Sequence, residues 1–361
     1  MRVAVLEFLT GGGLSAANSS DADKQALRPL FQEGLSMLSA LSLDLAECGH
    51  KVHLCLDQNL ATEDLVIGHR LDSNQLRVHS LSTDWIDCWI EIASLCDRTI
   101  VIAPELDQQL EQTVSRLRSA GIDVVASSDS FIRATSDKLA TAKMAEQAHV
   151  PHPKTSLLSD VRSSVGCDSF DDGLPLTLKR RDGAGCAEMI YFENSDLMFQ
   201  WLNRNHHSRW VDGDWIVQGW QTGIAASMAV IAELEWQIIG CVEQSISMQA
   251  DSAGCYSRVE YRGGRGPVES VTTKQLNDLL SRVRKAFPSG GKGWIGIDFI
   301  IPNSRSKTDD LVLVEVNPRL TTSYLGYRQW YGPRIADCIL GAMSVAELKC
   351  RRTSTLERIS F

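Results

Sequence analysis

The chain has 361 residues and a mass of 39.8 kDa, which predicts two or three compact units. Hydrophobic residues make up 43% of it and charged residues 22%, a composition typical of soluble globular enzymes. The net charge of −9 argues against nucleic acids and anionic membranes as partners, because both bind basic surfaces. No apolar run approaches the roughly 20 residues that span a bilayer.

The N-terminal residues 1–6 are mostly apolar, but Glu7 follows too soon for the apolar core of a signal peptide. We therefore predict a first β-strand there and a cytoplasmic chain. The ten cysteines are scattered without a C-x-x-C pair, which predicts reduced thiols and neither zinc nor disulfides. Cys186 stands beside a glycine-rich turn, and we interpret it as a small loop residue.

Strand-like and helical segments alternate through the first third of the chain. Strands are predicted at 3–8, 51–56, 98–103 and 122–126, and helices at 32–48 and 105–120. The first of these helices carries leucines three and four residues apart, and a polar loop from Thr10 to about Phe31 precedes it. The alternation predicts an open parallel sheet with helices on both faces.

Three glycines, at 11–13, follow the first predicted strand. They lack the G-x-G-x-x-G spacing of a dinucleotide site, but ligands of open α/β sheets bind at the carboxyl ends of the strands. We therefore take Gly12 and Gly13, together with Glu33 and Glu105 at later helix starts, as candidate substrate residues. The alternative for each acid is that it stabilises a helix N-terminus through the helix dipole.

Two lysines in the middle of the chain are candidate phosphate ligands. Lys138 falls in the first turn of a predicted helix, where a cation opposes the helix dipole unless an anion binds there; a solvated surface lysine is the alternative. Lys179 leaves a strand predicted at 174–178 and enters a turn that contains Gly183 and Gly185. Glycines let backbone N–H groups approach a phosphate, and the ammonium group neutralises its charge.

A strand predicted from Asp214 runs into an extended segment formed by Gln218, Gly219 and Trp220. Further strands are predicted at 226–233 and 237–242. An extended segment between two subdomains can hydrogen-bond an adenine edge through its backbone while apolar side chains sandwich the ring. These three residues are therefore candidates for binding a nucleotide base.

Arginines gather among glycines between residues 256 and 267 of an otherwise acidic protein. Arg258 and Arg262 suit the recognition of a carboxylate or phosphate, and a flexible solvated loop is an equally good explanation. His206 and His207 lack i, i+4 spacing, so we interpret them as surface or lid residues rather than metal ligands.

The most informative stretch is a predicted hairpin near the C-terminus. Its two strands are predicted at 293–300 and 311–319, and the polar loop between them at 302–310. Side chains alternate along a strand, so Glu315 and Asn317 share a face, and a hairpin centred in the loop brings Asp298 opposite Glu315. Two carboxylates and an amide oxygen suit Mg²⁺. Alternatively, both acids are ordinary residues on the wet face of a hairpin.

Taken together, these signals resemble the ATP-grasp family over about residues 130–330. The residues that carry the resemblance, in the order the family shows, are Asp137-Lys138, Lys179 with its glycine turn, Gln218 to Trp220, Asp298, and Glu315-x-Asn317-x-Arg319. It implies an α/β protein with the ATP-grasp fold, two α+β subdomains that grip ATP, preceded by an N-terminal open parallel α/β domain. We expect the N-terminal domain at 1–130 and the ATP-grasp domain at 131–361, with 150–212 as a mobile lid.

The resemblance also implies roles for individual residues. Lys138 and Lys179 would hold the phosphates of ATP. The metal Mg²⁺, with Mn²⁺ as the alternative, would bind to Asp298, Glu315 and Asn317, and Arg319 would steady the transferred phosphoryl group with Lys179 beside it. Many members have a glutamate beside the hinge where this chain has Gln218-Gly219-Trp220. The residue that holds the ribose therefore stays open, with Glu243 as one candidate.

Further runs look like the tyramine–glutamate ligases of the methanofuran pathway and their bacterial relatives in one-carbon cofactor synthesis. These runs are Thr10 to Gly13, Glu33-Gly34-x-x-Met37, Ala103 to Glu105, and Asn317 to Tyr324. The last run adds Thr321 and Thr322 as substrate candidates. The resemblance implies that ATP activates a carboxylate, such as that of glutamate, to an acyl phosphate, which an amine then attacks to give an amide, ADP and phosphate.

The expected partners are thus small molecules, an amino acid and an amine, and apolar surface on the N-terminal unit would allow a homodimer. Two other functions compete with the ligase. A kinase-like grasp protein would transfer phosphate without needing an amine. A non-catalytic nucleotide-binding module would not require Asp298, Glu315, Asn317 and Arg319 together.

Overall fold

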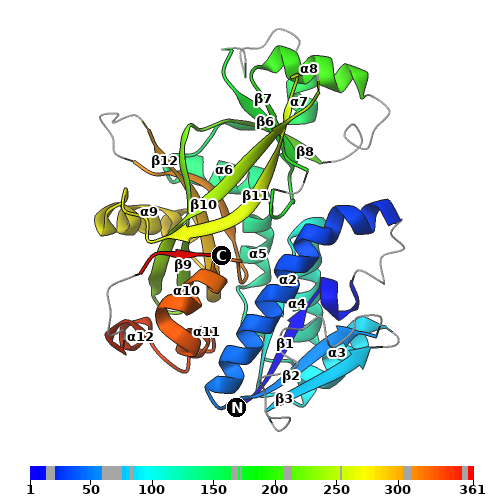
Figure 1. Cartoon of the computed structure of the whole chain (residues 1–361), viewed down its shortest axis with the longest axis vertical. Helices are drawn as coiled ribbons and strands as arrows, with labels where there is room; N and C mark the ends of the chain where they lie inside the picture. The colour runs from blue at the N-terminus through cyan, green and yellow to red at the C-terminus, as the bar shows by residue number, and fades with distance from the viewer. Residues whose placement is uncertain are drawn as a thin grey trace.

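The computed structural model describes residues 1–13, 21–58, 75–81, 84–163, 170, 173–186, 188–205, 214–252, 254–303, 310–351 and 357–361. The predictions for His206 and His207, and for parts of the lid and of the 302–310 loop, lie outside these described residues. Within them, the chain forms a four-stranded sheet from its N-terminal part and a ten-stranded sheet from the rest (Figure 1).

The small sheet is parallel throughout, in the order β3-β2-β1-β4. Its strands are β1 (Arg2–Glu7), β2 (Lys51–Asp57), β3 (Leu76–Leu81) and β4 (Arg98–Ile102). Its helices are α2 (Asp21–Glu47), α3 (Trp85–Ser94) and α4 (Gln109–Ser119). Because side chains alternate along β1, Val3 and Val5 pack with α2, whereas Ala4 and Leu6 pack with α3 and α4 on the other face. The predicted open parallel α/β unit is confirmed.

Two predictions for this unit are wrong in detail. The polar segment before Phe31 is not all loop, because α2 begins at Asp21 and runs through Pro29. Its apolar periodicity starts only near Leu35, where the helix reaches the sheet, so the earlier turns carried no signal. The strand predicted at 122–126 forms only an isolated bridge between Thr99 and Val124.

The large sheet has the order β13-β12-β9-β10-β11-β7-β6-β8-β5, with β14 paired to β11, and every pairing is antiparallel. Its strands are β5 (Thr155–Leu157), β6 (Leu176–Arg180), β7 (Ile190–Phe192), β8 (Trp215–Gly219), β9 (Gly223–Ala232), β10 (Trp236–Ala250), β11 (Ser257–Gly266), β12 (Gly293–Pro302), β13 (Val312–Asn317) and β14 (Ile359–Ser360). The long strands β10 and β11 run between its two halves (Figure 1). The arginine-containing segment predicted as a candidate loop is therefore a strand, β11.

Helices cover each half of this sheet. They are α5 (Asp129–Ser136), α6 (Lys138–Gln147), α7 (Leu158–Ser163), α8 (Ser195–Arg204), α9 (Thr273–Ala286), α10 (Tyr324–Tyr331), α11 (Ile335–Ile339) and α12 (Val345–Arg351). Helices α7 and α8 share a core with β6, β7 and β8, and α9 packs against β9, β12 and β13. The predicted pair of α+β halves is thus present. Among the described residues, no helix is both long and apolar enough to cross a membrane, and the nine described cysteines are free thiols, as predicted.

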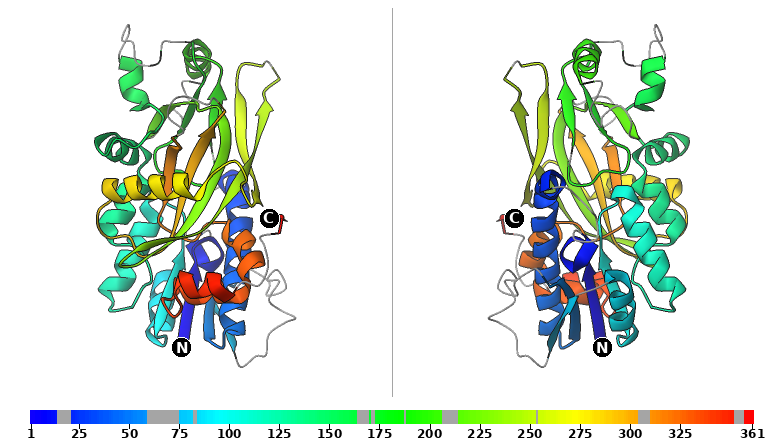
Figure 2. Two further views of the ribbon diagram at one scale, coloured as in Figure 1. Left: turned by 90° about the vertical axis from the view of Figure 1, so that its left-hand side faces the viewer. Right: turned by 90° about the vertical axis from the view of Figure 1, so that its right-hand side faces the viewer.

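The C-terminal helices join the core of the N-terminal unit. Helices α10 and α11, in orange tones in Figure 2, lie beside the blue helix α2. Asp44 of α2 is buried and accepts hydrogen bonds from the Tyr324 hydroxyl at 2.6 Å and from Arg328 Nε at 2.9 Å. The N-terminal sheet, α2, α10 and α11 therefore form one packed body. The division of the chain at residues 130 and 131, and the lid at 150–212, stay predictions.

Removing the Asp44 carboxylate should loosen this junction. Asp44→Ala leaves the buried Tyr324 hydroxyl without its acceptor, whereas the half-exposed Arg328 can be solvated. We expect a loss of about 2 kcal/mol of unfolding free energy, measured by urea denaturation. As a control, the exposed Glu91 on α3 changed to Ala should shift the free energy by less than about 0.5 kcal/mol. Equal unfolding midpoints for the two variants would contradict the proposed junction.

Candidate active site

A cavity of about 1340 Å³, including its open mouth, lies between the two halves of the large sheet and reaches α2 of the N-terminal unit. Most of the residues predicted from the sequence line it. These are Glu33, Lys138, Lys179, Gly183, Gly185, Gln218, Gly219, Trp220, Asp298, Glu315, Asn317, Arg319, Thr321 and Thr322. Residues separated by almost 300 positions in the chain thus meet in one space.

One wall of the cavity is a row of polar side chains across three strands. Asp298 of β12 lies directly opposite Glu315 of β13, which confirms the predicted hairpin register, and opposite Ser227 of β9 on its other side. Residues directly opposite on neighbouring strands point to the same face. A β-bulge follows Asp298 in the β12–β13 pairing, where Phe299 pairs with Leu313. Bulges of this kind end regular pairing and re-aim side chains.

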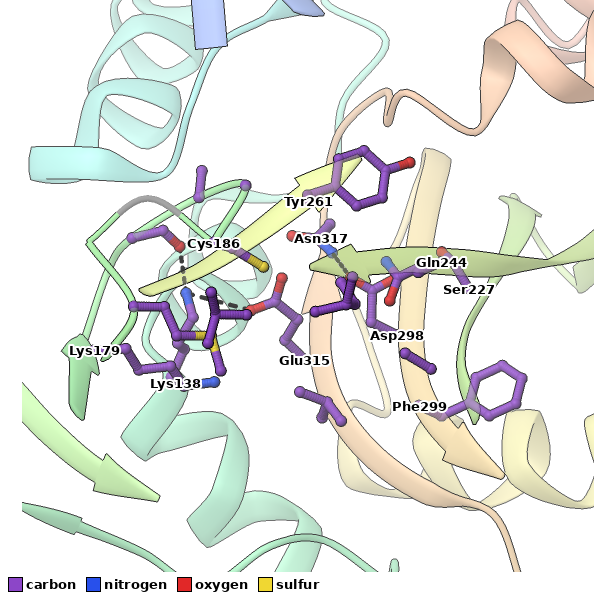
Figure 3. A pocket seen from close by; sticks show the side chains of 18 of the residues that line it. Lys138, Lys179, Cys186, Ser227, Gln244, Tyr261, Asp298, Phe299, Glu315 and Asn317 are labelled. Atoms are coloured by element: carbon purple, nitrogen blue, oxygen red, sulfur yellow. Dashed lines mark hydrogen bonds and ion pairs between the residues drawn. The ribbon is translucent and has the colours of Figure 1, made fainter. Parts of the chain in front are cut away.

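Asp298 accepts hydrogen bonds from three side chains, those of Ser227, Gln244 and Asn317. Asn317 Nδ2 lies 3.1 Å from Asp298 Oδ2, and Figure 3 shows this contact at the centre of the wall. Burial raises the pKa of Asp298, and repulsion from Glu315 raises it further, while the three hydrogen bonds partly offset both effects. Sequence reasoning missed Ser227, although it is the one polar side chain in the apolar run of β9.

Two lysines approach the carboxylate wall, Lys179 from β6 in the other half of the sheet and Lys138 from the first turn of α6. Lys138 Nζ lies 3.4 Å from Glu315 Oε2 and also donates to the carbonyl of Gly183 (Figure 3). Burial lowers the pKa of Lys179 to about 8, and Glu315 partly offsets this. Burial by itself would raise the pKa of Glu315, but the two lysines outweigh it and hold the pKa below its ordinary value. The alternative that Lys138 is a solvated surface residue is wrong, because Lys138 is only 8% exposed.

Local bonds fix Lys138 at the start of α6. Asp137 caps this helix by accepting from the backbone N–H groups of Leu139 and Ala140 at 2.9 and 3.0 Å. It also pairs with Arg181, whose Nε lies 2.8 Å from Asp137 Oδ1. The backbone N–H of Lys138 donates to the carbonyl of Arg181 at 3.0 Å. The helix start and the turn after β6 are therefore held together, which sets the spacing of the two lysines.

The turn after β6 comes close to the N-terminal unit. Gly185 has φ +61°, and a Cβ atom there would lie 2.9 Å from Leu30 Cδ2, so both its conformation and its surroundings favour glycine. Cys186 lines the cavity with φ +58°. Burial raises the pKa of the Cys186 thiol to about 12, so it remains protonated at neutral pH. This agrees with its interpretation as a small loop residue.

The segment Gln218 to Trp220 lies along one side of the cavity. Gln218 donates through Nε2 to Thr155 Oγ1 at 2.9 Å, so its side chain supports β5. The backbone N–H groups of Gly219 and Trp220 donate to the carbonyls of Lys154 and Pro175. These two N–H groups already have acceptors, so fewer backbone donors in this segment remain to bind a base. Glu243, one candidate for the ribose, does not line the cavity and pairs with Arg265 at 2.6 Å.

The end of the cavity nearest the N-terminal unit holds Arg319. Its Nε lies 3.0 Å from both oxygens of Glu105, and its Nη2 lies 2.9 Å from Glu105 Oε2. Both side chains are almost fully buried. Glu105 was predicted as a residue at this edge, but its partner was not, because 214 positions separate the two. An acid from the N-terminal unit therefore holds the arginine that follows the carboxylate hairpin.

Two threonines after the hairpin line the same region. Thr322 Oγ1 donates to the Tyr261 hydroxyl at 3.1 Å, and Thr321 Oγ1 accepts from Trp294 Nε1 at 3.1 Å. Tyr261 comes from β11 and lines the cavity (Figure 3). Burial raises its pKa above the ordinary value, so the phenol keeps its proton. The sequence analysis did not identify Tyr261, since its flanking arginines carried the signal.

Arg258 and Arg262, predicted as substrate residues, do not line the cavity. They are exposed on β11, where Arg262 donates to Ser247 Oγ at 3.1 Å. Alternation along the strand turns Val259 and Tyr261 toward the cavity in their place. The prediction assigned no strand to this segment, so it could not separate the face toward the cavity from the face toward solvent.

Gly12 and Gly13 also lie away from the cavity lining. A Cβ atom on Gly12 would lie 2.6 Å from the Cβ of Trp85, and one on Gly13 would lie 2.5 Å from Phe8 Cε2. Trp89 Nε1 donates to the carbonyl of Gly11 at 3.1 Å. The glycines therefore allow close packing against aromatic rings, and the structure gives no contact between them and the cavity.

Comparison with known proteins identifies the family. Residues 135–323 match the family described as the ATP-grasp domain, and residues 51–132 match the pre ATP-grasp 3 domain. The first match covers more than half of the chain, and the chain therefore belongs to the ATP-grasp family. Its fold is the ATP-grasp fold with a pre-ATP-grasp domain at the N-terminus. No curated protein matches the sequence.

Solved structures share this fold at low sequence identity. A protein from Archaeoglobus fulgidus assigned to the ATP-grasp superfamily aligns with a TM-score of 0.64 at 19% identity, over 94% of this chain and 88% of that one. The N5-carboxyaminoimidazole synthetase from Staphylococcus aureus, complexed with ADP, aligns with a TM-score of 0.59 at 13% identity. The alignment covers 89% of this chain and 71% of that one. The N5-carboxyaminoimidazole ribonucleotide synthetase from Thermotoga maritima aligns with a TM-score of 0.57 at 15% identity. The alignment covers 94% of this chain and 75% of that one.

A second buried acid beside Arg319 gives a prediction about stability. Burial raises the pKa of Glu7 from 4.5 to about 7, although hydrogen bonds from Thr10 partly oppose the shift. Between pH 4.5 and about pH 7, Glu7 therefore keeps its proton in the folded chain but loses it in the unfolded chain. Its stabilising effect is complete below pH 4.5 and is lost as the pH rises through 7. Relative to wild type, Glu7→Gln should gain ~3 kcal/mol of unfolding free energy over this range.

The measurement is urea denaturation of both proteins at about pH 4.5 and about pH 8. Comparing the two proteins at each pH cancels the titration of all other groups. The exposed Glu91 changed to Gln serves as the control and should show no such pH-dependent gain. A constant difference between wild type and Glu7→Gln would mean that Glu7 titrates normally.

Proposed function

We propose that the protein is an ATP-dependent ligase that activates a carboxylate as an acyl phosphate and joins it to an amine. The observation that carries the proposal is the meeting of Asp298, Glu315 and Asn317 with Lys138 and Lys179 in one cavity. Anionic and amide oxygens on one wall suit a divalent cation, and buried ammonium groups opposite them suit phosphates. Membership of the ATP-grasp family supports the same reading.

The residues present fit a magnesium ion. Asp298 and Glu315 are two half-buried carboxylates side by side, and their repulsion contributes to the raised pKa of Asp298. Asn317 donates its Nδ2 to Asp298, which leaves the amide oxygen as a ligand. Mg²⁺, or Mn²⁺ in its place, would be held by these three residues together with substrate phosphates. When bound, such an ion neutralises charge on the phosphates and polarises the transferred group.

ATP would occupy the space between the two halves of the large sheet. Lys138 and Lys179 would contact its phosphates, with Gly183 and Gly185 allowing close approach of the backbone. The base would lie near Gln218 to Trp220, where the ring of Trp220 meets Tyr191 at a centroid distance of 5.2 Å. The Staphylococcus aureus synthetase, which shares the fold, was solved with ADP, and this supports a nucleotide site in the present chain.

The proposed reaction has two steps. A carboxylate oxygen of the acid substrate attacks the terminal phosphorus of ATP, the bond to the bridging oxygen breaks, and ADP leaves. Arg319 would steady the transferred group, and Lys179 would neutralise charge on it. An amine nitrogen then attacks the acyl carbon, a C–N bond forms, and phosphate leaves. Acyl phosphates react readily with water, so closure of residues 150–212 as a lid would protect the intermediate.

The proposed substrates come from the finer resemblance to tyramine–glutamate ligases. Glutamate, or a similar amino acid, would supply the carboxylate, and tyramine is the first amine to test, in the context of one-carbon cofactor synthesis. The residues Thr321 and Thr322, which belong to the most specific run of that resemblance, line the cavity beside Arg319. A kinase-like transfer of phosphate is the second candidate, and the assay below separates the two.

The first test is phosphate release with Mg-ATP and glutamate, with and without tyramine and a panel of other amines. We expect release to require both acid and amine, and the product to be lighter than their sum by one water. Chelation of the divalent cation should stop release, and Mg²⁺ or Mn²⁺ should restore it. Phosphate transfer that ignores the amine would establish the kinase-like function in place of the ligase.

Glu315→Ala tests the proposed metal wall. The variant removes one of two carboxylates and leaves Lys138 without its ion-pair partner. We expect the rate of phosphate release to fall by about 10²-fold or more, because such electrostatic contributions dominate phosphoryl transfer. Glu146→Ala, an exposed acid on the helix that begins with Lys138, is the matched control and should keep the wild-type rate. Full activity in Glu315→Ala would refute the assignment of this wall.

A further inference from the structure

Three acidic side chains line the cavity within the described residues: Glu33, Asp298 and Glu315. The last two belong to the proposed metal wall, and Asp298 accepts three hydrogen bonds while Glu315 pairs with Lys138. Glu33 differs from them, because in the part of the chain that the structure describes it has neither a hydrogen bond nor an ion pair. A cavity-facing carboxylate without a partner is costly unless a ligand compensates its charge.

Glu33 comes from the N-terminal unit and lies at a defined place in the site. Glu33 is on helix α2, which extends from the small sheet toward the large sheet (Figure 1). A Cβ atom built on Gly185 would lie 3.7 and 3.9 Å from the two carboxylate oxygens of Glu33, so the glycine turn after β6 passes beside them. Arg319 is near enough to act on Glu33 electrostatically. The carboxylate thus lies between the proposed phosphate turn and the arginine proposed to steady the transferred group.

Arg319 does not satisfy Glu33. Its Nε and Nη2 donate to Glu105, its Nη1 donates to the carbonyl of Leu320 at 3.2 Å, and none of these hydrogen bonds goes to Glu33. The two residues therefore share an electrostatic interaction without a bond between them. A negatively charged acid substrate would be repelled by Glu33, whereas a protonated amine would be attracted to it. Glu33 therefore favours a cationic group at its position in the cavity.

We infer that Glu33 binds the ammonium group of the amine substrate and accepts the proton that this group loses before attack. The inference rests on the proposed function and deepens it by assigning the nucleophile a subsite on the N-terminal unit. The substrate class is a primary amine that is protonated in solution. The subsite would lie near the proposed phosphate turn and Arg319, so the amine would be held close to the acyl phosphate.

The protons of this step balance. One proton passes from the ammonium nitrogen to the Glu33 carboxylate, which leaves a neutral amine with a lone pair. The nitrogen then forms a bond to the acyl carbon, the bond from that carbon to the phosphate oxygen breaks, and the second proton of the nitrogen leaves with the phosphate. Glu33 returns its proton to solvent after the product departs. Burial raises the pKa of Glu33, with Arg319 opposing the shift, and a more basic carboxylate is a better proton acceptor.

The test separates the two half-reactions with hydroxylamine. This small nucleophile is largely uncharged near neutral pH and captures acyl phosphates as hydroxamates, so it reports activation of the acid without needing an ammonium site. Wild type and Glu33→Gln are compared with Mg-ATP and glutamate, with either hydroxylamine or tyramine as nucleophile. We expect amide formation with tyramine to fall by about 10²-fold or more in Glu33→Gln, and hydroxamate formation by at most a few-fold.

Two further proteins complete the design. Glu47→Gln changes an exposed acid at the other end of the same helix, and both of its rates should match wild type. Glu33→Asp keeps the charge on a shorter side chain and should recover part of the amide rate. Retained hydroxamate formation in Glu33→Gln also shows that this variant is folded and binds ATP.

Each outcome decides the matter. Loss of both products in Glu33→Gln would overturn the inference, because Glu33 would then serve the activation of the acid. Unchanged formation of both products would overturn it while the ligase function stands. Wild type that forms neither hydroxamate nor amide would refute the proposed function, and the inference would fall with it.

Discussion

Asp298 and Glu315 stand directly opposite each other on two paired strands, both turned into the same cavity. Two half-buried carboxylates in this position repel each other, and hydrogen bonds and cations from the surrounding residues stabilise them. Three side chains donate hydrogen bonds to Asp298, and the ammonium groups of Lys138 and Lys179 act on Glu315. Lys179 comes from β6 in the opposite half of the large sheet, so its charge also links the two halves of the site.

The N-terminal unit takes part in the site as well as supporting it. Glu105 holds Arg319 with a bidentate contact, and Glu33 reaches the cavity from α2. Helix α2 is in turn fixed to α10 through Asp44, Tyr324 and the surrounding core. A shift of the N-terminal unit would therefore move Arg319 and the Glu33 carboxylate together. This coupling is a physical reason for an α/β domain to precede the grasp fold in this chain.

The similarity to solved structures reaches most of the chain, although fewer than one residue in five is identical. Core positions need only be apolar and of suitable volume, so a fold persists through extensive substitution. Substrate choice depends on a few side chains at the cavity, and the shared fold leaves these free to change. The proposals for this protein accordingly rest on its own residues, in particular Glu33 and the threonines beside Arg319.

The sequence by itself determined the features that depend on neighbours in the chain. Strand alternation and the length of one loop were enough to predict that Asp298 faces Glu315, and the strand and helix alternation predicted the parallel N-terminal sheet. Only the tertiary structure decided which face of β11 meets the cavity, so that Tyr261 lines it and Arg258 and Arg262 do not. It also decided the bond from Glu105 to Arg319 and the place of Glu33 beside Gly185. These contacts join residues more than 100 positions apart, and no local periodicity or spacing records which distant segments will pack together.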